Sequence, residues 1–324
     1  MLTDKTGLIV VPDQALATLP IHLMLKSPHD PAQSLANAHW LIRDHSIEIA
    51  PTVASFEILR NGKSKQDTAR RAFLGIGDPL IGVQSDGPLN YACEETRPPL
   101  TVAALTTPEF QRSVGALRTS LVADLAALPD TRCELRAIAE RFEDSTTLLH
   151  ADATESRIKE MNAAGKLRDI SVLNFATHGL IAGEIGVNEA GLVLTPPTVV
   201  SAQDDGLLTT AEIADLDLNA DFVILSACNT AAGDSRDSEG LSGLATAFFL
   251  AGAKSLLVSH WPVYSDASVL LSTGTFEVLA ENPDATRAQA LRMTMLSILD
   301  DPNASPRTLH PSYWGPFMLV GDGG

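Results

Sequence analysis

The stretch DFVILSACNT, residues 221–230, is a hydrophobic run that ends abruptly at a cysteine. Residues 222–225 have the continuous apolar composition of a strand buried on both faces of a parallel sheet. The residues that follow, 231–240, contain glycine, serine and aspartate, which is typical of a surface loop. Since ligands of open α/β sheets bind at the carboxyl edge of the strands, we expect Cys228 to face outward at that edge.

A second stretch, SVLNFATHG at residues 171–179, has the same form, an apolar run followed by His178 and Gly179. Two neighbouring parallel strands that end in this way would place His178 and Cys228 at one edge of the sheet. A thiol with an ordinary pKa of about 8.5 is only a few per cent ionised at neutral pH, and a nearby imidazole is the usual means of activating it. The pattern therefore predicts Cys228 as a nucleophile and His178 as its base.

Gly179 adds a third element to this predicted site. A residue without a Cβ atom lets a substrate backbone approach, and its N–H group can point at a developing oxyanion. Losing one such donor typically costs on the order of 10²–10³ in rate. We expect the backbone N–H groups of Gly179 and Cys228 to form the oxyanion hole.

Taken singly, each of these residues has an ordinary structural interpretation. A lone cysteine after an apolar strand is more often a small buried hydrophobic residue, and a lone histidine is usually a core or surface residue. The pair is more informative, because both residues follow similar strands and the histidine precedes the cysteine by about 50 residues, as in caspases. The cysteine is framed by Ser-Ala and Asn-Thr, however, and not by the caspase pentapeptide.

Further motifs occur in order along nearly the whole chain. They are LIVVPD (8–13), GDP (77–79), FATHG (175–179), LSACNT (225–230), Glu239-Gly240, WPV (261–263) with Asp266, and His310-Pro311 with LVGD (319–322). With these motifs the chain resembles the CHAT family of bacterial caspase-like cysteine peptidases, which are related to caspases and separases.

The resemblance implies a caspase-like fold, an α/β sandwich in which helices flank a central, mainly parallel sheet. It also implies peptide-bond hydrolysis by a His/Cys dyad and TPR-type repeats in the same chain or in a partner chain. Under this resemblance Glu239 and Asp266 are candidates for organising the catalytic loops. We expect residues 1–150 to form a supporting half and residues 151–324 the catalytic half.

The composition and motifs argue against several classes of function. The net charge of −17 argues against nucleic acid as the main partner, because neutralising phosphates requires clustered Lys and Arg. No phosphate-binding or dinucleotide-binding glycine motif is present, and His260 and His310 lack partners at metal-ligand spacing, so we predict neither a cofactor nor a metal. No apolar run approaches the ~18 residues of a membrane span, and no secretory leader pattern begins the chain.

The three cysteines, Cys93, Cys133 and Cys228, are an odd number without Cys-x-x-Cys spacing. This speaks against a disulfide framework or a structural zinc and fits a reducing, cytoplasmic location. Glu94 and Glu95 beside Cys93 would oppose formation of its thiolate, so we treat Cys93 as incidental.

Local patterns predict the remaining elements. Apolar runs predict further strands at 8–11, 47–50, 72–76, 146–149, 255–259 and 317–320, and apolar periodicity predicts helices at 110–128, 131–143 and 154–164. Thr131 and Glu134 have the spacing of a capping box, and Asp266 is a candidate N-cap. Residues 183–209 are interpreted as a loop region that overhangs the site.

The predicted function is that of a cysteine endopeptidase acting on a protein or peptide substrate. Asp234 and Glu239 follow the nucleophile closely, and they would favour a basic substrate residue, form a solvated loop or mark a self-processing site. The alternative from another class is a non-catalytic or latent interaction module that acts by binding a protein partner.

Overall fold

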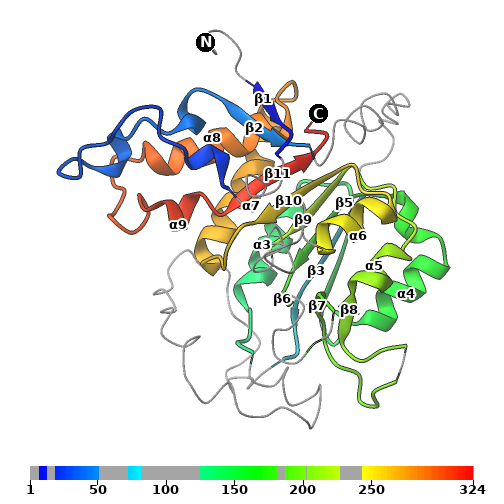
Figure 1. Ribbon diagram of the computed structural model, residues 1–324. Helices are drawn as coiled ribbons and strands as arrows, with labels where there is room; N and C mark the ends of the chain where they lie inside the picture. Colours follow the sequence, from blue (N-terminus) through cyan, green and yellow to red (C-terminus); the bar gives the residue numbers. More distant parts are fainter. Residues whose placement is uncertain are drawn as a thin grey trace.

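The computed structural model describes residues 7–12, 19–50, 72–81, 125–180, 187, 189–201, 203–226 and 243–323. In these residues a central eight-stranded sheet has the order β1-β2-β11-β10-β9-β5-β3-β4 (Figure 1). The strands are β1 (Gly7–Val10), β2 (Ser46–Ile49), β3 (Ala72–Pro79), β4 (Asp144–His150), β5 (Ile170–Ala176), β9 (Phe222–Leu225), β10 (Ser255–Ser259) and β11 (Phe317–Gly321). Each overlaps a strand predicted from an apolar run.

Neighbouring strands of this sheet are parallel in every pair except β10 and β11. The predicted mainly parallel α/β architecture is therefore confirmed. Because β11 is antiparallel to β10 but parallel to β2, strands β1, β2 and β11 run opposite to the other five. The carboxyl ends of β10, β9, β5, β3 and β4 consequently share one edge of the sheet.

Helices cover both faces of the sheet, and successive strand residues point to opposite faces (Figure 1). Phe73 and Phe222 belong to the core on one face, whereas Leu74 and Val223 belong to the core on the other. The first core includes side chains of α3 (Asp130–Ala139), α7 (Ser265–Glu281) and α8 (Arg287–Leu299). The second includes side chains of α4 (Glu155–Ala163), α5 (Thr210–Ala214) and α6 (Gly243–Ala251).

Shorter helical segments lie in the connections. They are the 3₁₀ helices Ile21–Leu23, Leu35–Asn37, Leu41–Arg43 and Lys166–Asp169, and the one-turn helix α9 (Pro311–Trp314). None of the helices in the described ranges is both long and apolar enough to cross a membrane.

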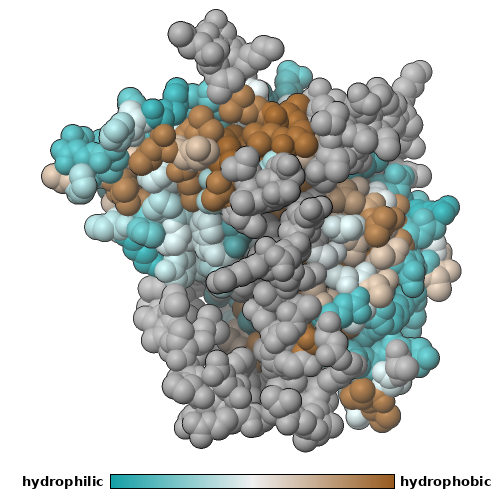
Figure 2. Space-filling model, in the orientation of Figure 1, coloured by the Kyte–Doolittle hydropathy of each residue, from teal (hydrophilic) through white to brown (hydrophobic). Residues whose placement is uncertain are grey.

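Strand β1 ends the sheet on one side. Ile9, Val11 and Leu19 are each more than two-fifths exposed (42%, 43% and 45%). Figure 2 shows hydrophobic side chains gathered over the β1–β2 end of the sheet. The described residues therefore leave an apolar surface at this edge.

A second, antiparallel sheet consists of β6 (Gly179–Leu180), β7 (Gly191–Val193) and β8 (Leu207–Thr209). The interpretation of residues 183–209 as a loop region is therefore wrong for β7 and β8. Both strands are three residues long, too short for alternation to reveal them. Since β6 begins directly after His178, this sheet starts at the predicted site.

Two predicted helix caps are also wrong. Helix α3 begins at Asp130 after Pro129, and Glu134 is fully buried instead of turning back to cap the helix. The hydroxyl of Thr131 donates to the Leu128 carbonyl at 2.7 Å. Helix α7 begins after Tyr264, without a side-chain cap, so Asp266 lies in its first turn. Instead of capping their own helices, Glu134 and Asp266 bond to residues far away along the chain.

The remaining predictions have mixed outcomes. Thr154 caps α4 by accepting from the Arg157 N–H at 3.2 Å. The helix predicted over 110–128 lies outside the described residues up to 124, and 125–128 are not helical. Cys133 is disulfide-bonded, with its partner outside the described residues. The expectation drawn from the odd number of cysteines is thus wrong for Cys133, because spacing along a chain does not show which side chains meet in the fold.

Strands from both sides of residue 150 belong to the one central sheet, in which β3 lies between β4 and β5. The described part of residues 1–150 thus contributes four strands to this sheet, and the described part of 151–324 the other four. The division into a supporting and a catalytic half stays a prediction. Under this prediction, residues 1–150 would support the site through β3 and β4, which lie beside β5 in the sheet.

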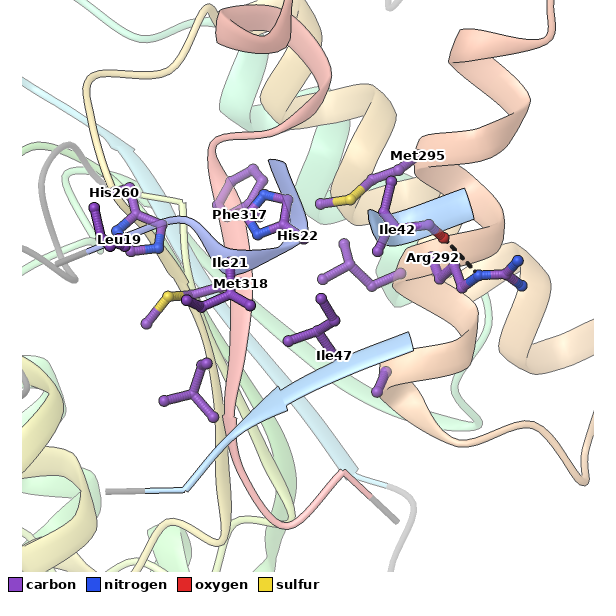
Figure 3. A pocket seen from close by; sticks show the side chains of 13 residues that line it. Leu19, Ile21, His22, Ile42, Ile47, His260, Arg292, Met295, Phe317 and Met318 are labelled. Atoms are coloured by element: carbon purple, nitrogen blue, oxygen red, sulfur yellow. Dashed lines mark hydrogen bonds between the residues drawn. The ribbon is translucent and has the colours of Figure 1, made fainter. Parts of the chain in front are cut away.

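A pocket lies between the 3₁₀ helix Ile21–Leu23, β2, α8 and β11 (Figure 3). Two histidines line it, and the centroids of the His22 and His260 rings are 6.4 Å apart. The Nε2–H of His22 donates to the Gly315 carbonyl at 2.8 Å. Burial lowers the pKa of both histidines to about 4, so both rings are neutral at physiological pH.

We expect His22→Gln to make the protein less sensitive to acid. Between pH 6.5 and about 4 the unfolded chain binds a proton at His22 that the folded protein does not bind, so stability is lost as the pH falls. At pH 5 this loss is about 2 kcal/mol for the one group. Glutamine keeps a donor for Gly315 and cannot become charged. Urea unfolding at pH 7 and pH 5 measures the difference, and equal losses in both proteins would contradict this account.

Candidate active site

The carboxyl ends of β5 and β9 lie side by side because the two strands pair in parallel, with Phe175 opposite Leu225. The ladder continues beyond β9, since the Ser226 N–H donates to the Phe175 carbonyl at 3.0 Å. His178 follows the end of β5 at this edge. Cys228, Asp234 and Glu239 lie outside the described residues, and the described chain stops at Ser226, two positions before the predicted nucleophile.

His178 is held by a backbone carbonyl. Its Nε2 atom is 2.8 Å from the carbonyl oxygen of Ala126. A carbonyl oxygen can only accept, so Nε2 carries the proton and Nδ1 is the unprotonated nitrogen of the neutral ring. Burial lowers the pKa of His178, while the bond to Ala126 opposes this in part. The imidazole is therefore neutral and oriented, with Nδ1 as its basic atom.

Gly179 lies in β6, opposite Leu192 of β7. The Val193 N–H donates to the His178 carbonyl at 2.9 Å. In an antiparallel ladder this bond makes Gly179 and Leu192 a non-hydrogen-bonded pair, so the ladder does not use the Gly179 N–H. That N–H group points away from β7, as a donor to an oxyanion would.

A buried carboxyl lies beneath the ends of β5 and β9. Oε1 of Glu134 accepts from the Asn174 amide at 3.1 Å and from the Ser226 hydroxyl at 2.8 Å. Asn174 belongs to β5 and Ser226 directly follows β9. Burial raises the pKa of Glu134, and the hydrogen bonds from Asn174 and Ser226 oppose this in part. Helix α3 is thereby tied to the two strands that lead to the predicted dyad.

An ion pair is buried at the ends of the neighbouring strands β3 and β4. The Asp78 carboxylate accepts from Nε and Nη2 of Arg132 at 2.9 and 2.6 Å, and Nε2 of His150 lies 3.3 Å from it. Asp78 and His150 have φ angles of 46° and 53°, in the left-handed region that side chains rarely adopt. Such strained residues persist only where surrounding contacts fix them, and here the ion pair fixes the edge beside β5.

Asp266 connects the first turn of α7, which follows β10, with the segment that leads into α9. Its carboxylate accepts from both terminal nitrogens of Arg307 at 3.0 Å and from the Tyr313 hydroxyl at 3.1 Å. The Arg307 guanidinium lies over the rings of Tyr264 and Tyr313, 4.9 and 5.1 Å from their centroids. The carboxylate is thus already neutralised by a fixed cation, which suits a loop-organising residue better than a free site for a basic substrate residue.

No cluster of three or more His, Cys, Asp or Glu side chains suited to hold a metal ion occurs in the part of the chain that the structure describes. The arrangement around His178 instead provides a proton acceptor at Nδ1 and an N–H donor at Gly179. These are groups of acyl-transfer chemistry.

Several contributors to the site were missed by sequence reasoning. The Ala126 carbonyl has no sequence signal, because any residue type supplies a carbonyl. Asn174 does have one, since it is a polar residue inside the apolar run of β5, and a buried amide needs partners. Glu134 was assigned to a local cap, although its side chain in fact reaches β5 and the end of β9.

Parts or all of the chain are similar to several known proteins. A 115-residue part of the chain is 33% identical to tetratricopeptide repeat protein 28 of Mus musculus, over 36% of this chain and 4% of that protein. The crystal structure of the Arg-specific cysteine proteinase gingipain R superposes with a TM-score of 0.50 at 11% identity, covering 98% of this chain and 63% of that chain. Separase in the Saccharomyces cerevisiae separase–securin complex gives a TM-score of 0.45 at 13% identity, over 87% of this chain and 14% of that chain.

The chain therefore spans only a small part of the repeat protein and less than two thirds of the gingipain chain. At such low identity the gingipain likeness indicates a shared caspase-like fold and nothing more. The model of the CHAT domain, in contrast, matches residues 3–322, nearly the whole length. This protein belongs to the CHAT domain family.

Proposed function

We propose that this chain is a cysteine endopeptidase in which Cys228 is the nucleophile and His178 the general base. The observation that carries the proposal is the bond between His178 Nε2 and the Ala126 carbonyl, which leaves Nδ1 as the basic nitrogen at the carboxyl edge of β5. The β5–β9 pairing supports it, because the chain leaves β9 toward Cys228 at the same edge. Membership of the CHAT family, with a caspase-like fold, is consistent with this chemistry.

The proposed reaction proceeds through an acyl-enzyme. His178 Nδ1 takes the thiol proton, and the Cys228 sulfur forms a bond to the carbonyl carbon of the scissile peptide. The Gly179 and Cys228 N–H groups stabilise the oxyanion. The C–N bond then breaks, and the proton passes from His178 to the leaving amine. Water attacks the thioester with His178 again as base, which releases the carboxylic acid and restores the thiol.

The remaining site residues receive supporting roles. Asp266 organises the loop after β10 through Arg307, as its paired carboxylate suggests. We propose Glu239 as a second loop-organising residue and Asp234 as a candidate for contact with a basic substrate residue. The substrate is a segment of a protein partner. Regulation by repeats is suggested by the name of the tetratricopeptide repeat protein that part of this chain resembles.

Replacing the nucleophile provides the first test. Cys228→Ala should abolish cleavage of a mixed-sequence peptide library, read by mass spectrometry, and His178→Ala should reduce it by about 10²–10⁴-fold because the general base is lost. All variants are assayed with a reducing agent, because Cys133 is disulfide-bonded. Lys26→Ala, which removes one partner of an exposed ion pair with Asp44, is the control and should leave every cut in place. If Cys228→Ala cuts the same bonds at the wild-type rate, the nucleophile is assigned wrongly.

The pH dependence tests the base. Because burial lowers the pKa of His178, we expect its imidazole to titrate below pH 6.5 and to be neutral, hence basic, at pH 7. NMR titration of His178 in the Cys228→Ala background measures this without interference from the thiol. A midpoint above 6.5 in that background would mean that the ring is not held neutral by its surroundings.

A further inference from the structure

The hydrogen bonds around Glu134 are unevenly distributed between its two oxygens. Oε1 accepts from both Asn174 and Ser226, whereas Oε2 is buried and has no hydrogen-bond partner among the described residues. Oδ1 of Asn174 is likewise buried, and no described residue donates to it. Glu134 and Asn174, which are already joined by one hydrogen bond, therefore each keep one acceptor oxygen that accepts no hydrogen bond from a described residue.

A single proton on Oε2 would satisfy both atoms. An ionised carboxyl can only accept, so it would leave Oε2 and Asn174 Oδ1 as two buried acceptors without a donor. The nearby Ser272 hydroxyl does not supply one, because it donates its proton to the Ser268 carbonyl at 2.8 Å. A protonated Oε2 can instead donate to the Asn174 oxygen while the Asn174 amide donates to Oε1, which closes a two-bond ring.

Within the described ranges, no cation lies close enough to Glu134 to stabilise its ionised form. On α3 itself, Arg132 is paired with Asp78 of β3, which also contacts His150 of β4. On α7, Asp266 is paired with Arg307, and β5 contributes His178, which is neutral. Glu134 is 0% exposed, and burial, opposed only in part by the hydrogen bonds, raises its pKa.

We propose that Glu134 is a protonated carboxylic acid in the folded protein, that it forms a closed acid–amide pair with Asn174, and that this pair positions the end of β9 through Ser226. Glu134 thus acts as a positioning residue for the nucleophile segment, which begins directly after Ser226. The positioning part rests on the proposed peptidase function, whereas the protonation part does not.

The protonation part is tested by stability against pH, with Glu134→Gln as the matched variant. Glutamine can form the same two bonds with Asn174 and still accept from Ser226, but it cannot ionise. A group whose pKa is raised in the folded protein stabilises it at low pH and loses that effect as the pH rises. The folding constant of the wild type, relative to that of Glu134→Gln, should fall by up to tenfold per pH unit above the ordinary glutamate pKa of about 4.3.

Urea unfolding of both proteins between pH 4 and pH 9 gives this ratio. A ratio that stays constant over the range would overturn the protonated assignment. A Glu134→Gln variant that is less stable than the wild type at pH 5 would also overturn the assignment. The neutral glutamine would then fail to replace the neutral carboxylic acid that we propose.

The positioning part is tested by the reactivity of the nucleophile. Glu134→Gln should keep the wild-type rate of Cys228 alkylation and the wild-type kcat for a cleaved peptide. Ser226→Ala removes one donor from Oε1, should fold normally, and should lower kcat about tenfold with little change in KM. Glu134→Ala should show the same kcat loss where it folds, and its stability is read in parallel.

The outcomes separate the two proposals. Cleavage that depends on Cys228 but is unchanged in Ser226→Ala would overturn the positioning role and leave the peptidase standing. If the wild type cuts nothing, the peptidase proposal fails. The pH profile of Glu134→Gln then still tests protonation, and the alkylation rate of Cys228 in Ser226→Ala still tests positioning.

Discussion

The parallel pairing of β5 with β9 is the constraint on which the candidate site depends. Phe175 lies opposite Leu225, and the Ser226 N–H donates to the Phe175 carbonyl, so the two strands end at the same edge of the sheet. A slip of one residue would exchange the faces to which Asn174 and its neighbours point. The cores on both sides prevent this, because alternate residues of each strand are buried against helices on both faces. Packing far from the site therefore determines where His178 emerges.

Buried polar groups fix the position of helix α3 against the strand ends at the carboxyl edge of the sheet. They are of two kinds, the charged pair Asp78–Arg132 at the end of β3 and the Glu134–Asn174–Ser226 cluster below β5 and β9. Removing one partner from a buried ion pair typically costs about 3–5 kcal/mol, so the first arrangement tolerates little change. The second carries no cation, which is why we assign it a proton instead of a charge. Between them, these groups tie α3 to three neighbouring strands at the edge from which His178 extends.

The strands and the position of His178 could be predicted from the sequence, because continuous apolar runs give both the burial and the ends of parallel strands. Side-chain partners far apart along the chain could not. Thr131 and Glu134 have capping-box spacing, yet the carboxyl of Glu134 bonds to Asn174 and Ser226, 40 and 92 residues away. Asp266 similarly bonds to Arg307, 41 residues away, instead of capping α7. Local patterns identify what a residue can do, and the tertiary fold selects the partner.

The central claim is that a thiol at position 228 is activated by His178, and covalent trapping tests it most directly. Peptidyl ketone electrophiles with mixed residues next to the reactive carbon would be incubated with the wild type and with His178→Ala, and the adducts mapped by mass spectrometry. Our account predicts a single adduct on Cys228 that forms at pH 7 and is strongly slowed in His178→Ala. An adduct on Cys93 instead, or equal labelling of Cys228 with and without His178, would contradict it.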